Sequence, residues 1–314
     1  MTLPLVLSFG SVNADIVAYG DRLPRPGETV HAGRYNIGLG GKGANQAAAA
    51  GRLAAGNGVT AALGGRIGDD PFGKLVRERL EGFGVDLSGL LLDEANPTGI
   101  ALIGVDAAAE NSITVVGAAN MAVGEDDVAR LADPLDRAAV LLLQLEIPVG
   151  AAVAAARRTR AAGGTVVLDP APVPAGGVPD ALLALADLVT PNETEAERLV
   201  GLRPTTPEEA ARAALLLRER GAGGAIVKLG ARGVFFSFRG EEGFVPPFEV
   251  RSVDSVAAGD SFNAGLAVAI AAGKSPPDAV RYAAACGALA TTRPGAADAA
   301  PFPEEVEALV AAAG

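Results

Sequence analysis

A short segment near the carboxyl end of the chain, residues 253–265, combines a carboxylate with small side chains at the start of a helical pattern. Asp260 follows Ala257, Ala258 and Gly259, and an apolar run with helical spacing comes next. The first amides of a helix lack intrahelical partners and carry positive partial charge, so small residues there let a phosphate approach closely. Such amides stabilise a transferring phosphoryl group while a carboxylate accepts the proton of the attacking hydroxyl. A simple helix N-cap at Asp260 is the alternative.

A glycine-rich run at residues 38–43 formally matches the dinucleotide-binding pattern G-x-G-x-x-G. That pattern expects an acidic residue about 20 positions later, but residues 44–68 contain no Asp or Glu. A P-loop is also excluded, because Lys42 is followed by glycine and Asn36 stands where the first glycine belongs. Two interpretations remain. Either the glycines bring the backbone close to a small polar ligand, with Lys42 and Asn45 as donors, or they form a turn that packs a helix.

Three further segments place polar side chains after predicted strands. Glu146 follows the apolar run 140–145, and ligands of parallel sheets bind beyond the carboxyl ends of strands, although a solvated loop carboxylate is equally compatible. Residues 192–195 open a helix with two carboxylates in its first turn, which capping alone would also explain. Residues 228–233 join two predicted strands and are compatible with an ordinary hairpin turn.

Short apolar strands alternate with helical patterns along the chain. Strands are expected at residues 5–12, 59–63, 139–145, 165–168, 188–190, 225–229 and 233–238. Helices are expected at residues 44–55, 71–83, 148–162 and 207–220, and from Asp260, Ser275 and Glu304 onwards. Continuous apolar strands separated by helices indicate a parallel sheet covered on both faces. The expected fold class is therefore α/β, a three-layer α/β/α sandwich with a mostly parallel central sheet.

Two segments depart from this pattern. Residues 15–37 and 98–116 contain alternating, partly polar strands with no helix between them. Alternation suits a sheet with one solvated or ligand-facing side. We expect these segments to form a small second sheet, and residues 1–14, 38–97 and 117–314 to form the main domain.

Composition excludes several classes of partner. With 314 residues and a net charge of −11, the chain can bury a large core and is unsuited to nucleic acid or anionic membranes, although a local amide nest can still bind a nucleotide. No segment has the roughly 18 apolar residues of a membrane span, and residues 1–7 lack the basic region of a signal peptide. We expect a cytoplasmic protein in which the single Cys286 is a small buried hydrophobe and the single His31 is solvated.

The motifs together resemble the signatures of the ribokinase family, the phosphofructokinase-B-type carbohydrate and nucleoside kinases. The matching segments keep the family's order along nearly the whole chain, at residues 10–15, 26–29, 40–47, 190–197, 228–233 and 254–262. The resemblance implies that the second sheet is a lid over a sugar. Lids of paired subunits often clasp together in this family, so a homodimer through the lid is expected.

The resemblance also implies a role for each motif. Asp260 would be the general base, and the amides of Ala257, Ala258, Gly259 and Asp260 would form the anion hole. The sugar would be held by Asn13, Asp15, Gly41, Lys42, Asn45, Glu146 and Asp260. The nucleotide would be held by Asn192, Lys228, Gly230, Arg232, Gly233, Gly259 and Ala284.

Two kinds of cation follow from the same resemblance. Glu195 would act on Mg²⁺ and its waters, since this ion takes few protein ligands. A monovalent activator such as K⁺ would be held by Asp254, Val256, Ala290, Arg293, Gly295 and Ala299. Lys228 stands where the family often has Thr, and Ala284 and Ala299 replace residues that are often polar, so nucleotide affinity and the cation loop are the points of departure.

The expected activity is the ATP-dependent phosphorylation of D-ribose at O5, which gives D-ribose 5-phosphate. The polar character of the implied sugar contacts favours a free sugar over a nucleoside. A related kinase of 2-deoxyribose, fructose or a nucleoside remains an alternative, as does a catalytically silent sugar-binding protein on the same fold. The intact pair of Gly259 and Asp260 argues against the silent protein, because binding alone needs no base beside an anion hole.

Overall fold

The central sheet consists of short, mostly apolar strands, as expected of a sheet that is buried on both faces. The computed structural model describes residues 2–108 and 110–313. Its larger sheet has nine strands in the order β13-β12-β11-β10-β9-β8-β1-β4-β5. The strands are β1 (Leu5–Phe9), β4 (Thr60–Gly68), β5 (Leu90–Asp93), β8 (Ala138–Leu143), β9 (Thr165–Leu168), β10 (Leu188–Val189), β11 (Ala225–Lys228), β12 (Val234–Phe238) and β13 (Glu241–Val245).

Neighbouring strands from β5 to β11 run parallel, whereas β12 and β13 are antiparallel additions at one edge. Successive side chains of β1 point to opposite faces of the sheet, so the hydrophobic core has one part on each face. Leu7 and Phe9 pack on one face of the sheet, and Val6 packs on the other. The predicted α/β sandwich with a mostly parallel sheet is therefore confirmed.

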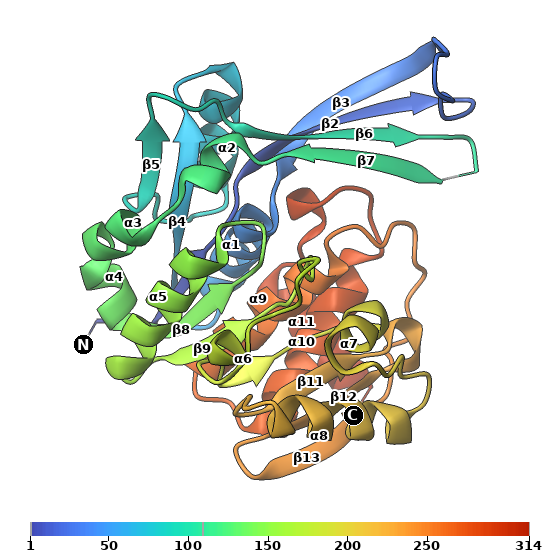
Figure 1. Cartoon of the computed structure of the whole chain (residues 1–314). Coiled ribbons are helices and arrows are strands. Elements are labelled where there is room, and N and C mark those ends of the chain that lie inside the picture. The colour runs from blue at the N-terminus through green and yellow to red at the C-terminus, as the bar shows by residue number, and fades with distance from the viewer. Residues whose placement is uncertain (1, 109, 314) are drawn as a thin grey trace.

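Helices cover both faces of this sheet (Figure 1). On one face lie α1 (Lys42–Ala54), α9 (Ala258–Ala271), α10 (Pro276–Ala290) and α11 (Pro303–Ala312). On the other face lie α3 (Glu125–Arg130), α4 (Ala132–Arg137), α5 (Val149–Ala161), α6 (Asp180–Leu183), α7 (Glu193–Val200) and α8 (Pro207–Glu219). The helix α2 (Pro71–Gly82) packs beside the second sheet, and it begins where Asp70 accepts the amide of Gly73 at 2.8 Å.

A second sheet of four strands, in the order β3-β2-β6-β7, projects from one end of the molecule (Figure 1). Its strands are β2 (Asn13–Gly20), β3 (Ala32–Gly40), β6 (Gly99–Val105) and β7 (Asn111–Val116). The predicted small sheet is confirmed, with β2 beginning at Asn13 and β3 reaching Gly40. Its outer strand β7 is exposed along its whole length.

Several short elements were not expected from the sequence. They are β5, β13, α3, α4, α6 and the 3-10 turns η1 (Ala118–Ala122), η2 (Gly230–Arg232) and η3 (Ala297–Ala299). β13 is a polar edge strand, and the short helices are too brief to show a helical period. The strand predicted at residues 5–12 ends at Phe9, after which Gly10 lies against Gln144 and Gly43.

The sequence contains one cysteine and one histidine. Cys286 is buried and unpaired, and His31 is exposed, as expected. Across residues 2–108 and 110–313, every helix is too short or too polar to cross a bilayer.

Candidate active site

The carboxyl ends of the parallel strands gather polar residues. Gln144 and Glu146 follow β8, Asp169 follows β9, Asn192 follows β10, and Lys228 is the last residue of β11. Because parallel strands end at one edge of a sheet, these side chains meet there. The sequence analysis missed Asp169, although its position directly after a predicted strand is the same signal that pointed to Glu146.

Asp260 lies in the first turn of α9 and is almost wholly buried, with 5% of its surface exposed. Its Oδ2 accepts a hydrogen bond from Nδ2 of Asn45 at 3.2 Å, and its Oδ1 accepts one from Nε2 of Gln46 at 3.0 Å. Both donors belong to α1, which follows the glycine run. In the described part of the chain, Oδ1 of Asn45 is buried without a partner, so a ligand hydroxyl can donate to it.

Gln46 connects Asp260 to a second carboxylate. Its Nε2 also donates to Oδ2 of Asp169 at 2.9 Å, and its Oε1 accepts from Nε2 of Gln144 at 2.6 Å. A side-chain amide that donates to two carboxylates and accepts from a third group has one orientation only. Sequence reasoning missed Gln46, although a polar residue within the alanine-rich run of α1 is a signal for a buried polar contact.

The charges around Asp260 shift several pKa values. Burial raises the pKa of Asp260 to about 6; Lys42 opposes this shift and Asp169 adds to it. Burial, together with the negative charges of Glu146 and Asp260, raises the pKa of Asp15 to about 7. The surrounding carboxylates, chiefly Asp260, raise the pKa of Lys42, so its ammonium is charged. A carboxylate that ionises near pH 6 suits a general base working at neutral pH.

The first residues of the second sheet face this cluster. Asn13 and Asp15 lie on the same face of β2, at its start. The carboxylate of Asp15 lies directly against Gly40, where a Cβ would be 1.9 Å from Oδ1 of Asp15. Gly41 has φ +84°, and a Cβ there would be 2.8 Å from the amide nitrogen of Asn13, so only glycine fits this turn.

Glu146, which follows β8 of the central sheet, accepts hydrogen bonds that hold the turn around Gly41 in place. Its Oε2 accepts from the amide of Lys42 at 3.0 Å and from Oγ of Ser11 at 2.5 Å. Asn13 is held in turn by Nδ2 of Asn120, which donates to its Oδ1 at 2.8 Å. The structure thus brings Asn13, Asp15, Lys42, Asn45 and Glu146 together around Asp260. Ser11 and Asn120 were missed, because their importance lies in contacts with residues distant in sequence.

The chain enters α9 through Ala257, whose φ of 56° is rare for alanine. The amide of Ala258 donates to the carbonyl of Ser255 at 3.3 Å. Within the ranges that the structure describes, the next two amides, those of Gly259 and Asp260, donate to no backbone carbonyl. The amide of Ala257, the residue before α9, donates to no carbonyl of these ranges either, so the amides of Ala257, Gly259 and Asp260 are available to an anion at the start of the helix.

Lys228 places a positive charge beside these amides. Its Nζ lies 3.7 Å from Oδ1 of Asp169, and it lies 3.6 Å from the point that a Cβ on Gly259 would occupy. The same ammonium lies 5.8 Å from the centre of the Phe262 ring. A cation held between a buried carboxylate and these free amides is well placed to meet a phosphate.

A cavity of about 440 Å³ opens next to Lys228 and Gly259. Its walls include residues predicted to hold the nucleotide, namely Asn192, Lys228, Gly230, Gly233, Gly259 and Ala284. Apolar side chains such as Phe248 and Val250 complete the lining. Arg232 is not part of it, because its guanidinium donates to Oε1 of Glu193 at 2.8 Å and to the carbonyl of Thr205 at 3.0 Å.

A larger open hollow of about 1170 Å³ lies at the opposite, amino ends of β1 and β4. It is lined by Arg52, Phe83 and Phe302 among others and contains none of the residues predicted for the site. The 440 Å³ cavity is therefore the one that matches the chemistry.

The residues predicted to hold cations occupy two places. Glu195 accepts from the amide and from Nδ2 of Asn192, each at 2.9 Å, as a capping box of α7. Burial raises the pKa of Glu195, and Lys228 opposes that shift. Among the described residues, no group of three or more His, Cys, Asp or Glu side chains could hold a metal.

The predicted monovalent-cation loop lies farther along the chain. Asp254 accepts from the amides of Val256 at 3.0 Å and Gly295 at 3.1 Å, so its carboxylate joins the two loop segments. Ala290 and Ala299 are buried beside them. Arg293 donates to Glu305 at 2.7 Å.

The chain is similar over most of its length to known carbohydrate kinases. Residues 3–303 match the family model described as pfkB family carbohydrate kinase. The chain is 38% identical over 296 residues to a ribokinase of Haemophilus influenzae, covering 94% of this chain and 95% of that protein. It is 34% identical over 253 residues to a deoxyribokinase of Salmonella typhimurium, covering 81% of each. A structure of Arabidopsis thaliana ribokinase complexed with ribose and ATP superposes with a TM-score of 0.88 at 36% identity and covers 99% of both chains.

Proposed function

The chain belongs to the pfkB family of carbohydrate kinases, and we propose that it transfers the γ-phosphoryl group of ATP to O5 of D-ribose. One observation carries the proposal. Asp260, a buried carboxylate with a pKa of about 6, lies between the polar cluster of the second sheet and the 440 Å³ cavity, at the helix start that offers free amides. A base between an acceptor site and a phosphate site is what phosphoryl transfer to a hydroxyl requires.

The sugar side is assigned to Asn13, Asp15, Gly41, Lys42, Asn45 and Glu146. These groups are almost all polar, and the free Oδ1 of Asn45 supplies an acceptor for a hydroxyl. Asp260 takes the proton of O5 as that oxygen attacks the phosphorus. The charged Lys42 nearby stabilises the ionised form of Asp260, because it lowers the pKa of that carboxyl.

The phosphate side is assigned to the start of α9 and to Lys228. Of the four amides predicted for the anion hole, those of Ala257, Gly259 and Asp260 are free to carry it, whereas that of Ala258 donates to the carbonyl of Ser255. Each anion-hole donor is worth about 10²–10³ in rate. The adenosine portion of ATP occupies the cavity beside Gly230, Gly233 and Ala284, and Asn192 lies at its phosphate end.

Mg²⁺ fits the end of the cavity beside Asn192. Glu195 in the first turn of α7 and Asp169 after β9 form a sparse set of carboxylates, which suits an ion that is held mainly by nucleotide phosphates and water. When bound, Mg²⁺ neutralises charge on the phosphates. Glu195 contributes a negative charge through its capping position, and Asp169 lies close enough to raise the pKa of Glu195.

A K⁺ ion fits the loop that Asp254 organises. One carboxylate beside two segments of backbone carbonyls is a donor set for a large hard cation. When bound, K⁺ supplies a positive charge that steadies the turn before α9. The residues that would hold it are Asp254, Val256, Ala290, Arg293, Gly295 and Ala299, with Arg293 near the site while paired to Glu305.

The second sheet is also proposed to pair two copies of the chain. It exposes apolar side chains on both faces: Tyr35 on β3, Leu102 on β6 and Val116 on β7 share one face, and Ile113 and Val115 on β7 lie on the other. Exposed apolar groups of this kind mark interaction surfaces. Light scattering should give a dimer for the wild type and a monomer for the double variant Ile113→Lys, Val115→Lys. Leu215→Lys, at an equally exposed leucine of α8, should stay dimeric, and a monomeric wild type would contradict the proposal.

The experiment that tests the function is ATP consumption against D-ribose, 2-deoxyribose, fructose and adenosine, with Mg²⁺ and with or without K⁺. The expected result is a preference for ribose that K⁺ increases. Preference for 2-deoxyribose would keep the mechanism and change the acceptor. No turnover from folded protein that binds ATP would favour a sugar-binding protein. The cytoplasmic location stays a prediction of the sequence.

A further inference from the structure

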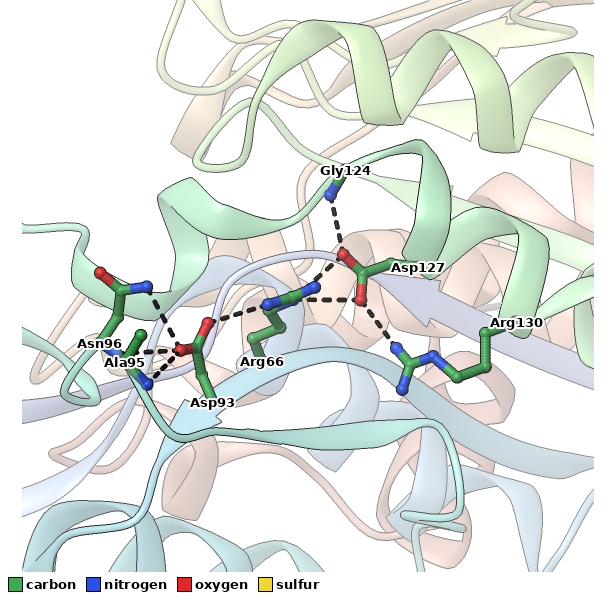
Figure 2. Close-up of polar contacts among 7 residues, drawn as sticks. All are labelled: Arg66, Asp93, Ala95, Asn96, Gly124, Asp127 and Arg130. Atoms are coloured by element: carbon green, nitrogen blue, oxygen red, sulfur yellow. Dashed lines mark hydrogen bonds and ion pairs between the residues drawn. The ribbon is translucent and has the colours of Figure 1, made fainter.

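Away from the candidate active site, one arginine holds two buried carboxylates that come from different elements (Figure 2). Nε of Arg66, on β4, lies 3.1 Å and 3.0 Å from the two carboxylate oxygens of Asp127, and its Nη1 donates to Oδ2 of Asp93 at 2.9 Å. Arg130 donates to Asp127 as well, at 2.7 Å. The side chains of Asp93 and Asp127 are only 4% and 2% exposed, so their charges must be satisfied inside the protein.

Each carboxylate fastens a connection between the two sheets. Asp93 ends β5, and its Oδ1 accepts from the amides of Ala95 and Asn96, each at 2.9 Å, in the turn that leads to β6. Asp127 accepts from the amide of Gly124 at 2.8 Å, just beyond η1, the segment that follows β7. β6 and β7 are neighbours in the second sheet. One guanidinium therefore holds both the entry into this hairpin and the exit from it.

The exit segment carries this link to the proposed sugar contacts. Asn120 in η1 is buried, its Oδ1 accepts the amide of Val12 at 2.8 Å, and its Nδ2 donates to Oδ1 of Asn13 at 2.8 Å. Gly99, the first residue of β6, packs against the same two side chains. A Cβ at position 99 would lie 2.3 Å from Nδ2 of Asn120 and 2.3 Å from Oδ1 of Asn13. Ala118, the first residue of η1, has φ 46°, a conformation that alanine adopts only where its surroundings impose it.

The chemistry of this charged cluster suits it to positioning the segments it joins more than to stabilising the fold. Two arginines balance two aspartates, but the desolvation of buried ions offsets most of their attraction. A planar guanidinium, however, fixes the direction of two carboxylates at once, which a lysine ammonium cannot do. We propose that Arg66 is a positioning residue that sets the β6–β7 hairpin and, through Asn120, the side chain of Asn13 over the acceptor sugar. The sugar and its contact with Asn13 rest on the proposed function.

The test compares Arg66→Lys with Arg220→Lys. Arg220, at the end of α8, is a matched control because it also uses a forked arrangement, with Nε and Nη2 donating to Asp180 at 3.0 Å and 2.7 Å. It also donates to the carbonyl of Leu199 at 2.7 Å. α8 lies at the opposite end of the molecule from the second sheet (Figure 1).

The readouts are KM for ribose, KM for ATP and the Kd of ribose measured by calorimetry without ATP. In Arg66→Lys, the KM and Kd for ribose should rise about tenfold or more, as expected for lost charge-assisted contacts, while KM for ATP stays within about twofold. Arg220→Lys should leave all three within about twofold, because ordinary changes away from the site have small effects. Unchanged ribose constants in Arg66→Lys, or an equal rise in KM for ATP, would overturn the proposal.

A second variant covers the case in which Arg66→Lys does not fold. Asp127→Asn loosens the exit segment that carries Asn120 and leaves the pair of Arg66 and Asp93 intact. A folded Asp127→Asn protein should show the same selective loss of ribose affinity, and wild-type ribose constants would overturn the proposal. If the wild type binds another sugar of the panel but not ribose, the proposed substrate fails, and the same comparison of variants is made with that sugar.

Discussion

The side-chain amide of Asn45 donates to the carboxylate of Asp260 at 3.2 Å, across 215 positions of the sequence. This bond joins the helix that follows the glycine run to the first turn of α9. The same amide keeps its Oδ1 free of any partner in the described part of the chain. One residue thus touches the proposed base and keeps an acceptor free for the proposed sugar, so we expect sugar binding and the orientation of the base to be coupled.

The contact between Asp15 and Gly40 predicts a variant with a selective defect in sugar binding. A Cβ at position 40 would lie 1.9 Å from Oδ1 of Asp15, so Gly40→Ala must displace that carboxylate. Loss of a hydrogen bond to a charged group is worth about 1.5–3 kcal/mol. We expect KM for ribose to rise about tenfold or more, with KM for ATP unchanged, in steady-state assays.

Gly38→Ala is the matched control on the same strand. No heavy atom of the described residues outside its chain neighbours lies within 4 Å of a Cβ at position 38. Its kinetics should equal those of the wild type. Equal defects in Gly38→Ala and Gly40→Ala would show that the strand, and not Asp15, is responsible.

Lys228 should matter for the nucleotide and not for the sugar. Its ammonium lies between Asp169 and the start of α9, and Lys228→Met removes the charge that would face the phosphates. We expect kcat/KM for ATP to fall by about 10²–10³, the effect of one lost anion-hole donor. The Kd of ribose, measured without ATP, should stay the same.

Lys274→Met provides the control for loss of a lysine charge. Lys274 contacts the ring of Tyr282, with Nζ 5.4 Å from the ring centre, and does not line the cavity. It should retain wild-type ATP kinetics. A Lys228→Met enzyme with normal kcat/KM for ATP would exclude a direct role of that ammonium.

The pKa of Asp260 predicts the acid limb of the pH profile. A general base must be ionised, so kcat/KM should fall as the pH drops through about 6. The negative charge of Asp169 raises the pKa of Asp260, and Asp169→Asn removes that charge. The inflection should therefore move to lower pH in Asp169→Asn. An inflection that stays in place or moves upward would contradict the assigned charge coupling.

The fold could be predicted because its main strands and helices are recognisable from local sequence patterns. Apolar runs such as residues 139–145 need no tertiary information to be recognised as buried strands, and the structure has β8 at Ala138–Leu143. The glycine run and the segment around Asp260 were found for a similar reason, since their residue types are unusual where they stand. The roles assigned to them remain predictions.

The partners of Asp260 could not be found in that way. The importance of Gln46 lies in two hydrogen bonds to Asp169 and Asp260, which are 123 and 214 positions away. Arg66 and Asp127 look like surface charges in the sequence, and only the tertiary structure pairs them and buries Asp127. The pairing of Arg232 with Glu193 could not be found from the sequence either, and the nucleotide contact that the family resemblance implies for Arg232 stays a prediction.

Turnover of ribose by Asp260→Asn is the most direct test of the mechanism. Asparagine keeps the size of the side chain, and its oxygen can still accept the hydrogen bond from Nε2 of Gln46, so the site should stay folded with Oδ1 of Asn45 left free for the sugar. The variant should lose about 10²–10⁴ in kcat, the usual contribution of a general base. Its Kd for ribose, measured by calorimetry, should remain close to the wild-type value. Near-normal turnover with intact ribose binding would remove Asp260 from the role of base.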